Sequence, residues 1–268
     1  MSTLWEAYAI RYAHHFRTAR ENFLGPALTE NDPHDGPMPM DYFVWAVRPF
    51  SEDRGRVFVI DTGFDEAMAR KRGREPLHPP DEGLRQIGIE AAHVEDVILS
   101  HLHYDHCGNH KMFPKARYHV QDREMFFATG RHMCHAHMRI PFEEDDVVEM
   151  VRRVFAGRVA FHDGDAEIAA GLSVHRVGGH SMGLQVIRVN TRRGWVVLAS
   201  DATHYYANME QGRPYPITYS VAETLEGFRR VSELASSPEH VIPGHDPLVL
   251  ERYPPPRPEL AGWIARLD

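Results

Sequence analysis

Residues 101–106 of the sequence read His101-Leu102-His103-Tyr104-Asp105-His106. Imidazole and carboxylate groups are the usual nitrogen and oxygen ligands of zinc in proteins. Alternate side chains of an extended segment point to the same side, so His101 and His103 can bind one ion together. A turn after them can direct Asp105 and His106 towards a second ion. A chance cluster on a polar loop is the alternative, but the pattern favours metal binding.

Three further candidate ligands, His180, Asp201 and His245, stand apart in the sequence, each shortly after an apolar stretch. Loops that follow strands collect at one edge of a sheet, so these side chains can meet the 101–106 segment there. Glycine directly precedes His180 and His245, and glycine lets the backbone approach a site closely. Taken singly, each would be an ordinary loop residue; together with the histidine-rich segment they complete a set of ligands.

Short apolar runs rich in β-branched and aromatic residues predict strands, and apolar residues at helical spacing predict helices. The expected strands cover residues 42–47, 57–60, 94–100, 117–120, 172–177, 184–189, 195–199 and 241–243, and the expected helices cover 143–155 and 221–234. This mixture is typical of a layered α/β protein rather than of a parallel, doubly wound sheet. No glycine-rich phosphate loop follows a strand, which argues against a nucleotide-binding fold.

The bulk composition restricts the expected partners. The chain has 268 residues and a net charge of -8 with neutral histidines, which makes nucleic acid an unfavourable partner. Its 2 cysteines cannot build a disulfide framework, and the stretch Met1–Ala13 does not have the pattern of a signal peptide. No run approaches the ~20 apolar residues that span a bilayer. We therefore expect a cytoplasmic, globular protein without nucleic acid or membrane as a partner.

In their order and context these segments, together with the turn Asp61-Thr62-Gly63, resemble the metallo-β-lactamase superfamily, from about residue 40 to residue 250. The resemblance implies an αβ/βα sandwich of two mixed β-sheets flanked by helices. It implies a single domain over residues 1–268, with the site in a groove at one edge between the sheets. We expect residues 131–155 to form a pocket-forming insertion and residues 251–268 a C-terminal tail, with an extended proline-rich run at 253–258.

The resemblance also implies one set of ligands for each of two metal ions. The first ion would be held by His101, His103 and His180. The second ion would be held by Asp105, His106 and His245. Asp201 would bridge the two ions, and Asp61 would orient a ligand histidine from outside, a role that such neighbouring groups often have. We expect two divalent metal ions, with zinc as the first candidate for both.

Within the superfamily the chain is most similar to the N-acyl-homoserine lactonase branch. The shared features are the Asp-Thr-Gly turn, the Met-Pro pair of Met38-Pro39-Met40 and the segment at residues 84–89, which precedes the histidine-rich segment. Zinc β-lactamases resemble the chain less, because they lack the bridging aspartate. Many of the lactonases have a tyrosine three residues after that aspartate, whereas here the position is His204, followed by Tyr205 and Tyr206.

The resemblance therefore implies a hydrolase that opens a lactone or ester, such as an N-acyl homoserine lactone or a related small cyclic ester. A hydroxide between the two ions would attack the carbonyl, since a zinc-bound water can have a pKa near ~7. His204, Tyr205 or Tyr206 would donate to the oxyanion, in that order of preference, and Asp105 would carry a proton to the leaving alkoxide. The lactone or ester is the expected small-molecule partner, and a homodimer is left open.

Three alternatives are kept. Hydroxyacylglutathione hydrolases, which are thioesterases, share all seven ligands, although no group of basic residues near the C-terminus is evident for a glutathione carboxylate. Some members of the superfamily with this motif are mononuclear iron dioxygenases that act on persulfides. A non-catalytic zinc-binding protein is the third alternative, and a complete ligand set for two ions argues against it.

Three other features have more than one interpretation. The stretch Arg131–Met138 contains His132, His135 and His137, and it predicts a pocket wall of Met and His side chains, a surface helix or a third metal site. Cys107 is most simply a small packed residue, with a ligand role as the alternative. The basic run at residues 70–74 is interpreted as a solvated loop, with anion binding as the alternative.

Overall fold

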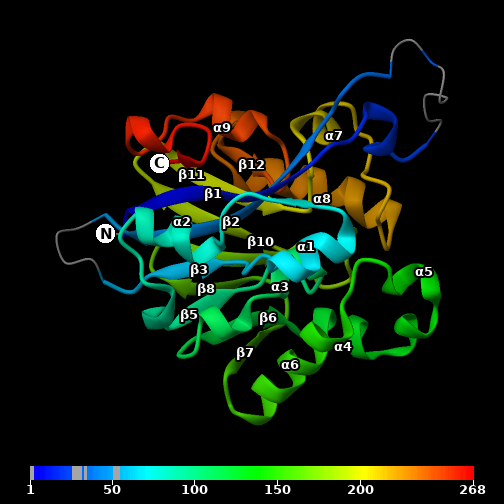
Figure 1. Ribbon diagram of the computed structural model, residues 1–268, viewed down its shortest axis with the longest axis horizontal. Coiled ribbons are helices and arrows are strands. Elements are labelled where there is room, and N and C mark those ends of the chain that lie inside the picture. Colours follow the sequence, from blue (N-terminus) through cyan, green and yellow to red (C-terminus); the bar gives the residue numbers. More distant parts are fainter. Residues whose placement is uncertain (1–2, 26–31, 33–34, 51–54) are drawn as a thin grey trace.

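Two mixed β-sheets face each other across a shared apolar layer in this protein, which we describe from a computed structural model. The structure describes residues 3–25, 32, 35–50 and 55–268, so the first two residues of the stretch tested for a signal peptide lie outside it. Helices cover the outer face of each sheet (Figure 1). The sandwich of two mixed sheets that the family resemblance implies is confirmed.

The larger sheet consists of β1 Trp5–His15, β2 Met40–Pro49, β3 Phe58–Ile60, β4 Glu75–Pro76, β5 Asp96–Ile98, β6 Arg117–Gln121, β7 Val159–His162 and β13 Ile264–Arg266. Their order is β13-β1-β2-β3-β5-β6-β7, and β4 pairs with β1. Antiparallel pairing joins β13, β1, β2 and β3, whereas β3, β5, β6 and β7 are parallel. The parallel strands all end at the same edge of the sheet.

The smaller sheet consists of β8 Ala166–Ala169, β9 Leu172–Arg176, β10 Gln185–Thr191, β11 Gly194–Ser200 and β12 Val241–Pro243. Their order is β12-β11-β10-β9-β8, and neighbours are antiparallel except for the parallel pair β11 and β12. The register of that pair sets Ser200 opposite Pro243. The segments that follow these two residues therefore leave the sheet side by side.

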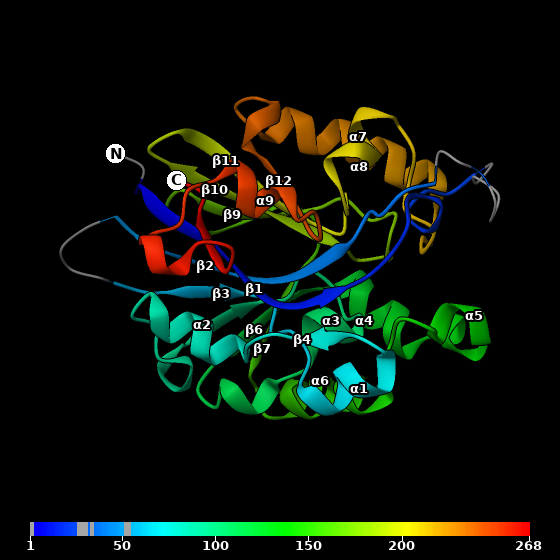
Figure 2. The ribbon, with the colours of Figure 1, turned by 45° about the horizontal axis from the view of Figure 1, so that its top comes forward.

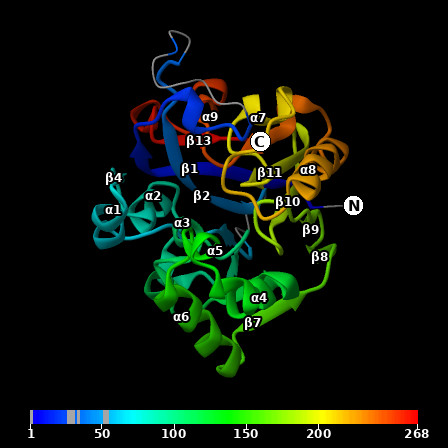
Figure 3. The same ribbon diagram turned by 90° about the vertical axis from the view of Figure 1, so that its right-hand side faces the viewer.

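The helices are α1 Glu66–Arg72, α2 Pro80–Gln86, α3 Tyr104–Cys107, α4 Asp122–Thr129, α5 Ala136–Arg139, α6 Glu144–Phe155, α7 Tyr206–Glu210, α8 Val221–Leu234 and α9 Leu248–Arg252. Figure 2 shows α8 and α9 on the side of the smaller sheet and α1, α2 and α6 on the side of the larger sheet. In Figure 3, α5 lies towards the viewer, near α3 and α4. Among the described residues, none of the helices combines the length and apolar content needed to cross a membrane.

The strand β2 shows why the centre of the larger sheet is apolar on both faces, since its first eight residues are all buried. Phe43 and Trp45 belong to the layer between the sheets, which also contains Leu198 of the smaller sheet. Tyr42 belongs to the apolar cluster beneath the helices of the larger sheet. Because successive side chains of a strand point to opposite faces, a strand covered on both faces has no polar side.

All the predicted strands and both predicted helices are present, with ends that differ by at most a few residues. The strands β1, β4, β7, β8 and β13 have no clear signal in the sequence, because alanines and charged residues interrupt their apolar pattern. The strand β13 lies within the expected C-terminal tail and pairs with β1. The end of the chain is therefore part of the larger sheet, and the extended tail is limited to the proline-rich run before it.

The amino end of α6 contains a carboxylate in an unfavourable environment. Burial, followed by the negative charges of Glu143, Asp145 and Asp65, raises the pKa of Asp146 to about 7. Because this folded-state pKa lies above the ordinary value of about 4, the folded protein binds the proton more tightly than the unfolded chain does. The contribution of Asp146 to the free energy of unfolding is therefore lost as the pH rises from about 4 through about 7.

We expect Asp146→Asn to raise the unfolding temperature by several degrees at pH 8, where Asp146 of the parent is ionised. At pH 5 the parent already carries the proton, so the difference between the two proteins should be much smaller. Thermal melts at both pH values measure this, with Asp145→Asn on the exposed side of the same turn as the matched control. A variant that melts below the parent at pH 8 would show that Asp146 stabilises the helix as an anion.

Candidate metal centre

The candidate ligands come from loops that meet at one edge of the two sheets. The loop after β5 passes through the histidine-rich segment into the one-turn helix α3. Asp201 and His245 follow the ends of the parallel neighbours β11 and β12, and they lie in contact. His180 comes from the turn that joins β9 to β10. The sandwich therefore brings together segments that are up to 144 positions apart, at positions 101 and 245 of the chain.

The ligand atoms of the seven predicted residues form two groups, and the atoms of each group lie within 4.8 Å of one another. The first group is His101, His103, His180 and Asp201, and the second is Asp105, His106 and His245. Asp201 approaches both: its Oδ2 lies 3.1 Å from Nε2 of His180, and its Oδ1 lies 3.0 Å from Nε2 of His245. The structure thus divides the seven residues as the family resemblance implies, with Asp201 between the two groups.

Several ring nitrogens in these groups are buried without a hydrogen bond to another described residue. Nε2 of His101 and Nε2 of His106 are buried without a hydrogen-bond partner among the described residues. Nδ1 of His103 lies 2.9 Å from Nε2 of His180, so two potential ligand atoms converge on one point. Buried polar atoms in proteins are normally hydrogen-bonded, and these exceptions therefore fit residues that hold a divalent ion.

The opposite nitrogens of two of these rings are fixed by backbone carbonyl groups. Nδ1 of His180 donates to the carbonyl oxygen of Ile217 at 2.7 Å, and Nδ1 of His245 donates to that of Asp41 at 2.8 Å. A donor at Nδ1 leaves Nε2 with a free lone pair directed into the group. Metal-binding histidines are commonly oriented in this way.

Burial sets the protonation states that metal binding requires. Desolvation, with the neighbouring imidazoles, lowers the pKa of His101 and His103 well below the usual value, so both rings are neutral. Burial alone would raise the pKa of Asp201, but the neighbouring His204 and His245 hold this pKa well below its usual range. His101 and His103 therefore offer neutral nitrogen atoms beside a negative oxygen, which is the donor set of a zinc site. At His106 and His245 burial lowers the pKa, but the negative charges of Asp201 and Asp105 outweigh it and raise the pKa of both rings, so an ion binding there would displace protons.

Asp61 connects the second group to the end of β3. Its Oδ2 accepts from Nδ1 of His106 at 2.7 Å, and its two oxygens accept from the backbone N–H and the hydroxyl of Ser100 at 2.7 and 2.8 Å. The backbone of Asp61 has a φ of 60°, which is unfavourable for most residues other than glycine, asparagine and aspartate. This strained conformation directs the carboxylate of Asp61 at His106. The family resemblance implies this orienting role for Asp61.

Glu124 of α4 is a positioning residue that the sequence does not reveal. It is fully buried, and burial raises its pKa although three donors oppose the shift. One oxygen accepts from the backbone N–H of Leu102 at 2.9 Å, and the other accepts from Ser181 at 2.5 Å and Gly183 at 2.9 Å. Glu124 therefore ties the loop that contains His101 and His103 to the loop that contains His180. No motif surrounds it.

The glycine before His245 lets the backbone pass close to Asp201, as expected from the sequence. A Cβ atom at Gly244 would lie 2.7 Å from Oδ1 of Asp201 and 2.8 Å from the carbonyl oxygen of Ser200. Such contacts are shorter than van der Waals distances permit. Any side chain here would displace the carboxylate between the two groups.

His204 lies at the centre, on the side of Asp201. Its Nε2 is 3.0 Å from Oδ2 of Asp201, and its ring stacks on Tyr215 with centroids 3.7 Å apart and planes at 11°. Burial lowers the pKa of His204 to about 3, so the imidazole is neutral near pH 7. Asp201, His204 and His245 also form a third group of converging ligand atoms. His204 therefore lies beside the ligand groups and lines the cavity next to them, and Tyr215 is a support for it that no sequence motif indicates.

Tyr205 and Tyr206 lie away from this centre, which differs from the expectation for Tyr205. Tyr205 precedes α7 and is buried in the cluster beneath the helices of the larger sheet, where its hydroxyl has no partner among the described residues. Tyr206 belongs to the layer between the sheets, under the guanidinium of Arg252. The helical turn that begins here directs both phenols into the core, and neither lines the cavity next to the ligands.

A cavity of about 80 Å³ opens onto the ligands, and a second of about 160 Å³ adjoins it. Both are lined by His103, His180, Ile140, Pro141 and Ile217. We call the second cavity the apolar groove; its other lining residues are Phe127, His137, Met138, Pro216, Thr218 and Tyr219. Part of the 131–155 segment thus forms a wall next to the centre.

The histidines of the 131–138 stretch do not converge on one another. Only His137 reaches the apolar groove, and the ring of His132 packs edge-on against Tyr219. None of His132, His135 and His137 belongs to a group of three converging ligand atoms among the residues that the structure describes. The stretch therefore forms part of a pocket wall. Cys107 is fully buried in the core and is absent from the described ligand groups.

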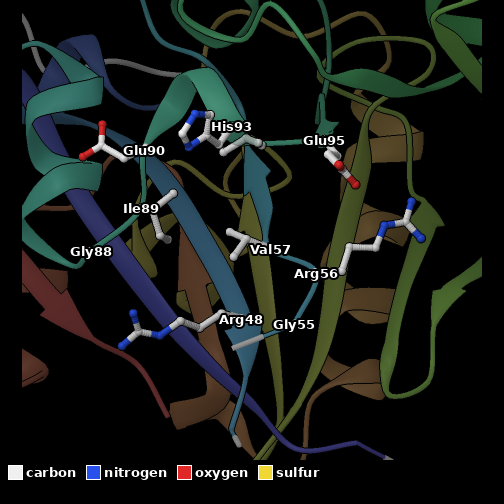
Figure 4. A pocket seen from close by; sticks show the side chains of 10 residues that line it. Arg48, Gly55, Arg56, Val57, Gly88, Ile89, Glu90, His93 and Glu95 are labelled. Carbon is white, nitrogen blue, oxygen red and sulfur yellow. The ribbon is translucent and has the colours of Figure 1, made fainter. Parts of the chain in front are cut away.

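Another cavity, of about 530 Å³, lies at the opposite ends of β3 and β5 (Figure 4). It is lined by segments that precede these strands, and side chains of both charges, such as Arg48, Arg56, Glu90 and Glu95, surround it. It contains none of the candidate ligands. The candidate ligand groups among the described residues thus lie at the other edge of the sheet.

The sequence profile described as the metallo-beta-lactamase superfamily matches residues 39–245, which include every candidate ligand. The chain belongs to the metallo-beta-lactamase superfamily.

Curated members of the superfamily that resemble the chain are named as lactonases. The N-acyl homoserine lactonase AiiA of Bacillus thuringiensis subsp. kurstaki is 27% identical over 165 residues, which are 61% of this chain and 60% of the relative. The N-acyl homoserine lactonase AiiB of Agrobacterium fabrum is 29% identical over 178 residues, which are 62% of this chain and 61% of the relative. The chain thus spans about three fifths of the length of these relatives.

Solved structures of the superfamily share the fold over most of the chain. A quorum-quenching N-acyl homoserine lactone hydrolase has a TM-score of 0.69 at 21% identity, over 92% of this chain and 93% of that chain. A dizinc quorum-quenching lactonase, AidC, has a TM-score of 0.67 at 15% identity, over 91% of this chain and 88% of that chain. A probable metal-dependent hydrolase from Staphylococcus aureus has a TM-score of 0.72 at 13% identity, over 92% and 91%.

Asp61→Asn should weaken metal binding about 10-fold to 100-fold, the usual effect of losing a group that orients a ligand. Asparagine tolerates the positive φ but cannot accept from His106 and both donors of Ser100 at once. Competition with a chromogenic chelator measures the affinity. Asp65→Asn, which changes the same group four residues later at the exposed cap of α1, is the matched control. Equal affinities in the parent and Asp61→Asn would mean that the carboxylate does not orient His106.

Proposed function

We propose that the chain is a metal-dependent hydrolase that opens a lactone or another ester with two divalent ions, for which zinc is the first candidate. The observation that carries the proposal is the position of Asp201, whose two oxygens approach different groups of ligands. A carboxylate in that position can serve two ions at once. The resemblance to proteins named as N-acyl homoserine lactonases supports the reaction class.

Two sets of side chains would hold the ions. The first set is His101, His103 and His180, the second is Asp105, His106 and His245, and Asp201 is shared. When bound, divalent ions supply a water of lowered pKa and polarise the carbonyl group of an ester. Both sets are buried, so competing water is excluded and the charges of the site act strongly on a bound substrate.

Asp105 and His204, which both line the cavity, would act on the substrate. Oδ2 of Asp105 lies 3.7 Å from Nε2 of His106 and 3.8 Å from Nε2 of His245, and the residue lines the cavity. Its carboxylate can take up a proton there and pass it to the departing alkoxide. His204 is neutral and stacks on Tyr215. Its Nε2 lies 3.0 Å from Oδ2 of Asp201, and once that carboxylate holds ions the N–H would be free to donate to the oxygen of the carbonyl group as negative charge develops.

The apolar groove beside His103 and His180 suits the non-reacting part of a substrate. Phe127, Met138 and Tyr219 offer it an aromatic and thioether surface. Binding sites for small molecules are usually apolar with a few polar groups that fix the orientation. An acyl chain or an apolar ring in this groove would keep its carbonyl group next to the ligands.

The second group of ligands bears on the choice among reactions. A mononuclear iron dioxygenase would require only one group, yet Asp105, His106 and His245 are at most 9% exposed and converge as closely as the first group does. This supports two ions. A thioesterase would use the same ligands, so only the choice of substrate separates it from a lactonase.

The proposal is tested with metal-loaded protein and a panel of lactones, thioesters and aryl esters that share one acyl chain. We expect lactone opening that disappears on chelation and returns when zinc is added. Faster turnover of thioesters would favour a thioesterase, and sulfur-dependent oxygen uptake with iron would favour a dioxygenase. Absence of any turnover by protein that carries two ions would contradict the proposal.

His204→Ala should reduce kcat about 10-fold to 1000-fold with little change in KM, as loss of one donor to an oxyanion does. Metal content, measured in the same samples, must remain at the parent level, because loss of an ion would instead identify His204 as a ligand. Tyr206→Phe, which removes a hydroxyl that faces the core, is the control and should have the parent kcat. An unchanged kcat in His204→Ala would remove this residue from the mechanism.

A further inference from the structure

Two arginines line the cavity next to the ligands without a carboxylate to neutralise them. Arg17, Arg72 and Arg74 all line this cavity. Arg72 forms an ion pair with Glu143 at 2.5 Å. Arg17 and Arg74 have no ion pair with a carboxylate among the described residues, and a guanidinium group is always charged at physiological pH. Asp105 and Asp201 line the same cavity, and the negative charge of Asp105 acts on Arg74 at a distance, but neither Arg17 nor Arg74 is held by a carboxylate in an ion pair.

The hydrogen bonds of Arg17 hold it in place but leave part of it unused. Its Nη1 donates to the hydroxyl of Tyr215 at 2.5 Å, and its Nη2 donates to the carbonyl oxygen of Glu21 at 2.6 Å. Its Nε is buried without a hydrogen-bond partner among the described residues. Tyr215 in turn stacks on His204, so Arg17 is linked through two side chains to the reacting centre.

Arg74 lies on the side of Asp105. Its Nε donates to the hydroxyl of Tyr104 at 3.0 Å, and its Nη1 donates to the carbonyl oxygen of Arg72 at 2.7 Å. Nη1 also lies 3.2 Å from Nε2 of His15. All these partners are neutral acceptors, so they fix the direction of the guanidinium without cancelling its charge.

His15 shows that the two guanidinium groups act on the same region. Burial, then the positive charges of Arg74 and Arg17, lowers the pKa of His15 to about 4. The imidazole is therefore neutral at pH 7 and can accept from Arg74. An anion bound between or beside the two guanidinium groups would offset the repulsion between their like charges.

We propose that Arg17 and Arg74 form a subsite for a carboxylate of the substrate, so that the natural substrate is a lactone or ester that already carries a negative charge. This rests on the hydrolase proposed above and narrows its substrate class. Guanidinium groups bind carboxylates through paired, charge-assisted hydrogen bonds, which position the ligand as well as attract it. The scissile carbonyl would then lie between this subsite and the ligands, in the cavity that adjoins the apolar groove.

A matched pair of probes tests the subsite: 4-acetoxybenzoate and its methyl ester, which share the scissile acetyl ester and differ in charge. With metal-loaded protein, Arg17→Gln and Arg74→Gln should each lower the ratio of kcat/KM for the acid to that for the methyl ester by about 10-fold or more, mainly through KM. Arg17→Lys and Arg74→Lys, which keep the charge, should retain part of the ratio. Arg123→Gln, on the exposed face of α4, should leave it unchanged.

The ratio separates the proposal from a general loss of activity, because damage to folding or to His204 lowers both rates together. Equal ratios in the parent and in both Gln variants would overturn the subsite. If the parent hydrolyses neither probe, the proposed hydrolase reaction is in doubt, and calorimetric binding of 4-hydroxybenzoate to the metal-loaded protein decides the subsite. Weaker binding in the Gln variants than in Arg123→Gln supports it, and equal binding overturns it.

Discussion

At the edge where the two sheets meet, the buried carboxylate of Asp201 is surrounded by imidazole rings. The structure around it depends on how these rings balance its negative charge. Asp201 is 4% exposed, and an isolated carboxylate in such a place is strongly disfavoured. The rings of His180 and His245 approach its two oxygens from opposite sides. The parallel register of β11 and β12 delivers Asp201 and His245 together, and Gly244 leaves room for the carboxylate between them.

The ligand residues could be predicted because their chemistry leaves a local trace in the sequence. His101, His103, Asp105 and His106 stand in one short segment, and the glycine before His245 marks a close approach of the backbone. The strands that carry them are short apolar runs, which is why their positions were predictable. The spacing of the ligands within residues 101–106 is set over a few positions, so a single sequence is enough to reveal it.

The supporting residues could not be predicted, since their roles arise from tertiary contacts. Glu124 lies on a short helix with no motif, yet it joins two loops that are 79 positions apart in the chain, at Leu102 and Ser181. Tyr215 meets His204 only after the chain has folded. The apolar pattern of β1 is hidden because alanines and charged residues interrupt it, and the phenol of Tyr205 turns into the core where the sequence order suggested the substrate.

The central claim is that two ions occupy the two groups of ligands and share Asp201. The most direct measurement is a crystal structure of zinc-loaded protein with anomalous diffraction data collected on both sides of the zinc absorption edge. The account predicts two anomalous peaks, one at His101, His103 and His180 and one at Asp105, His106 and His245, with Asp201 in contact with both. A single peak at full loading, or two peaks without contact to Asp201, would contradict it.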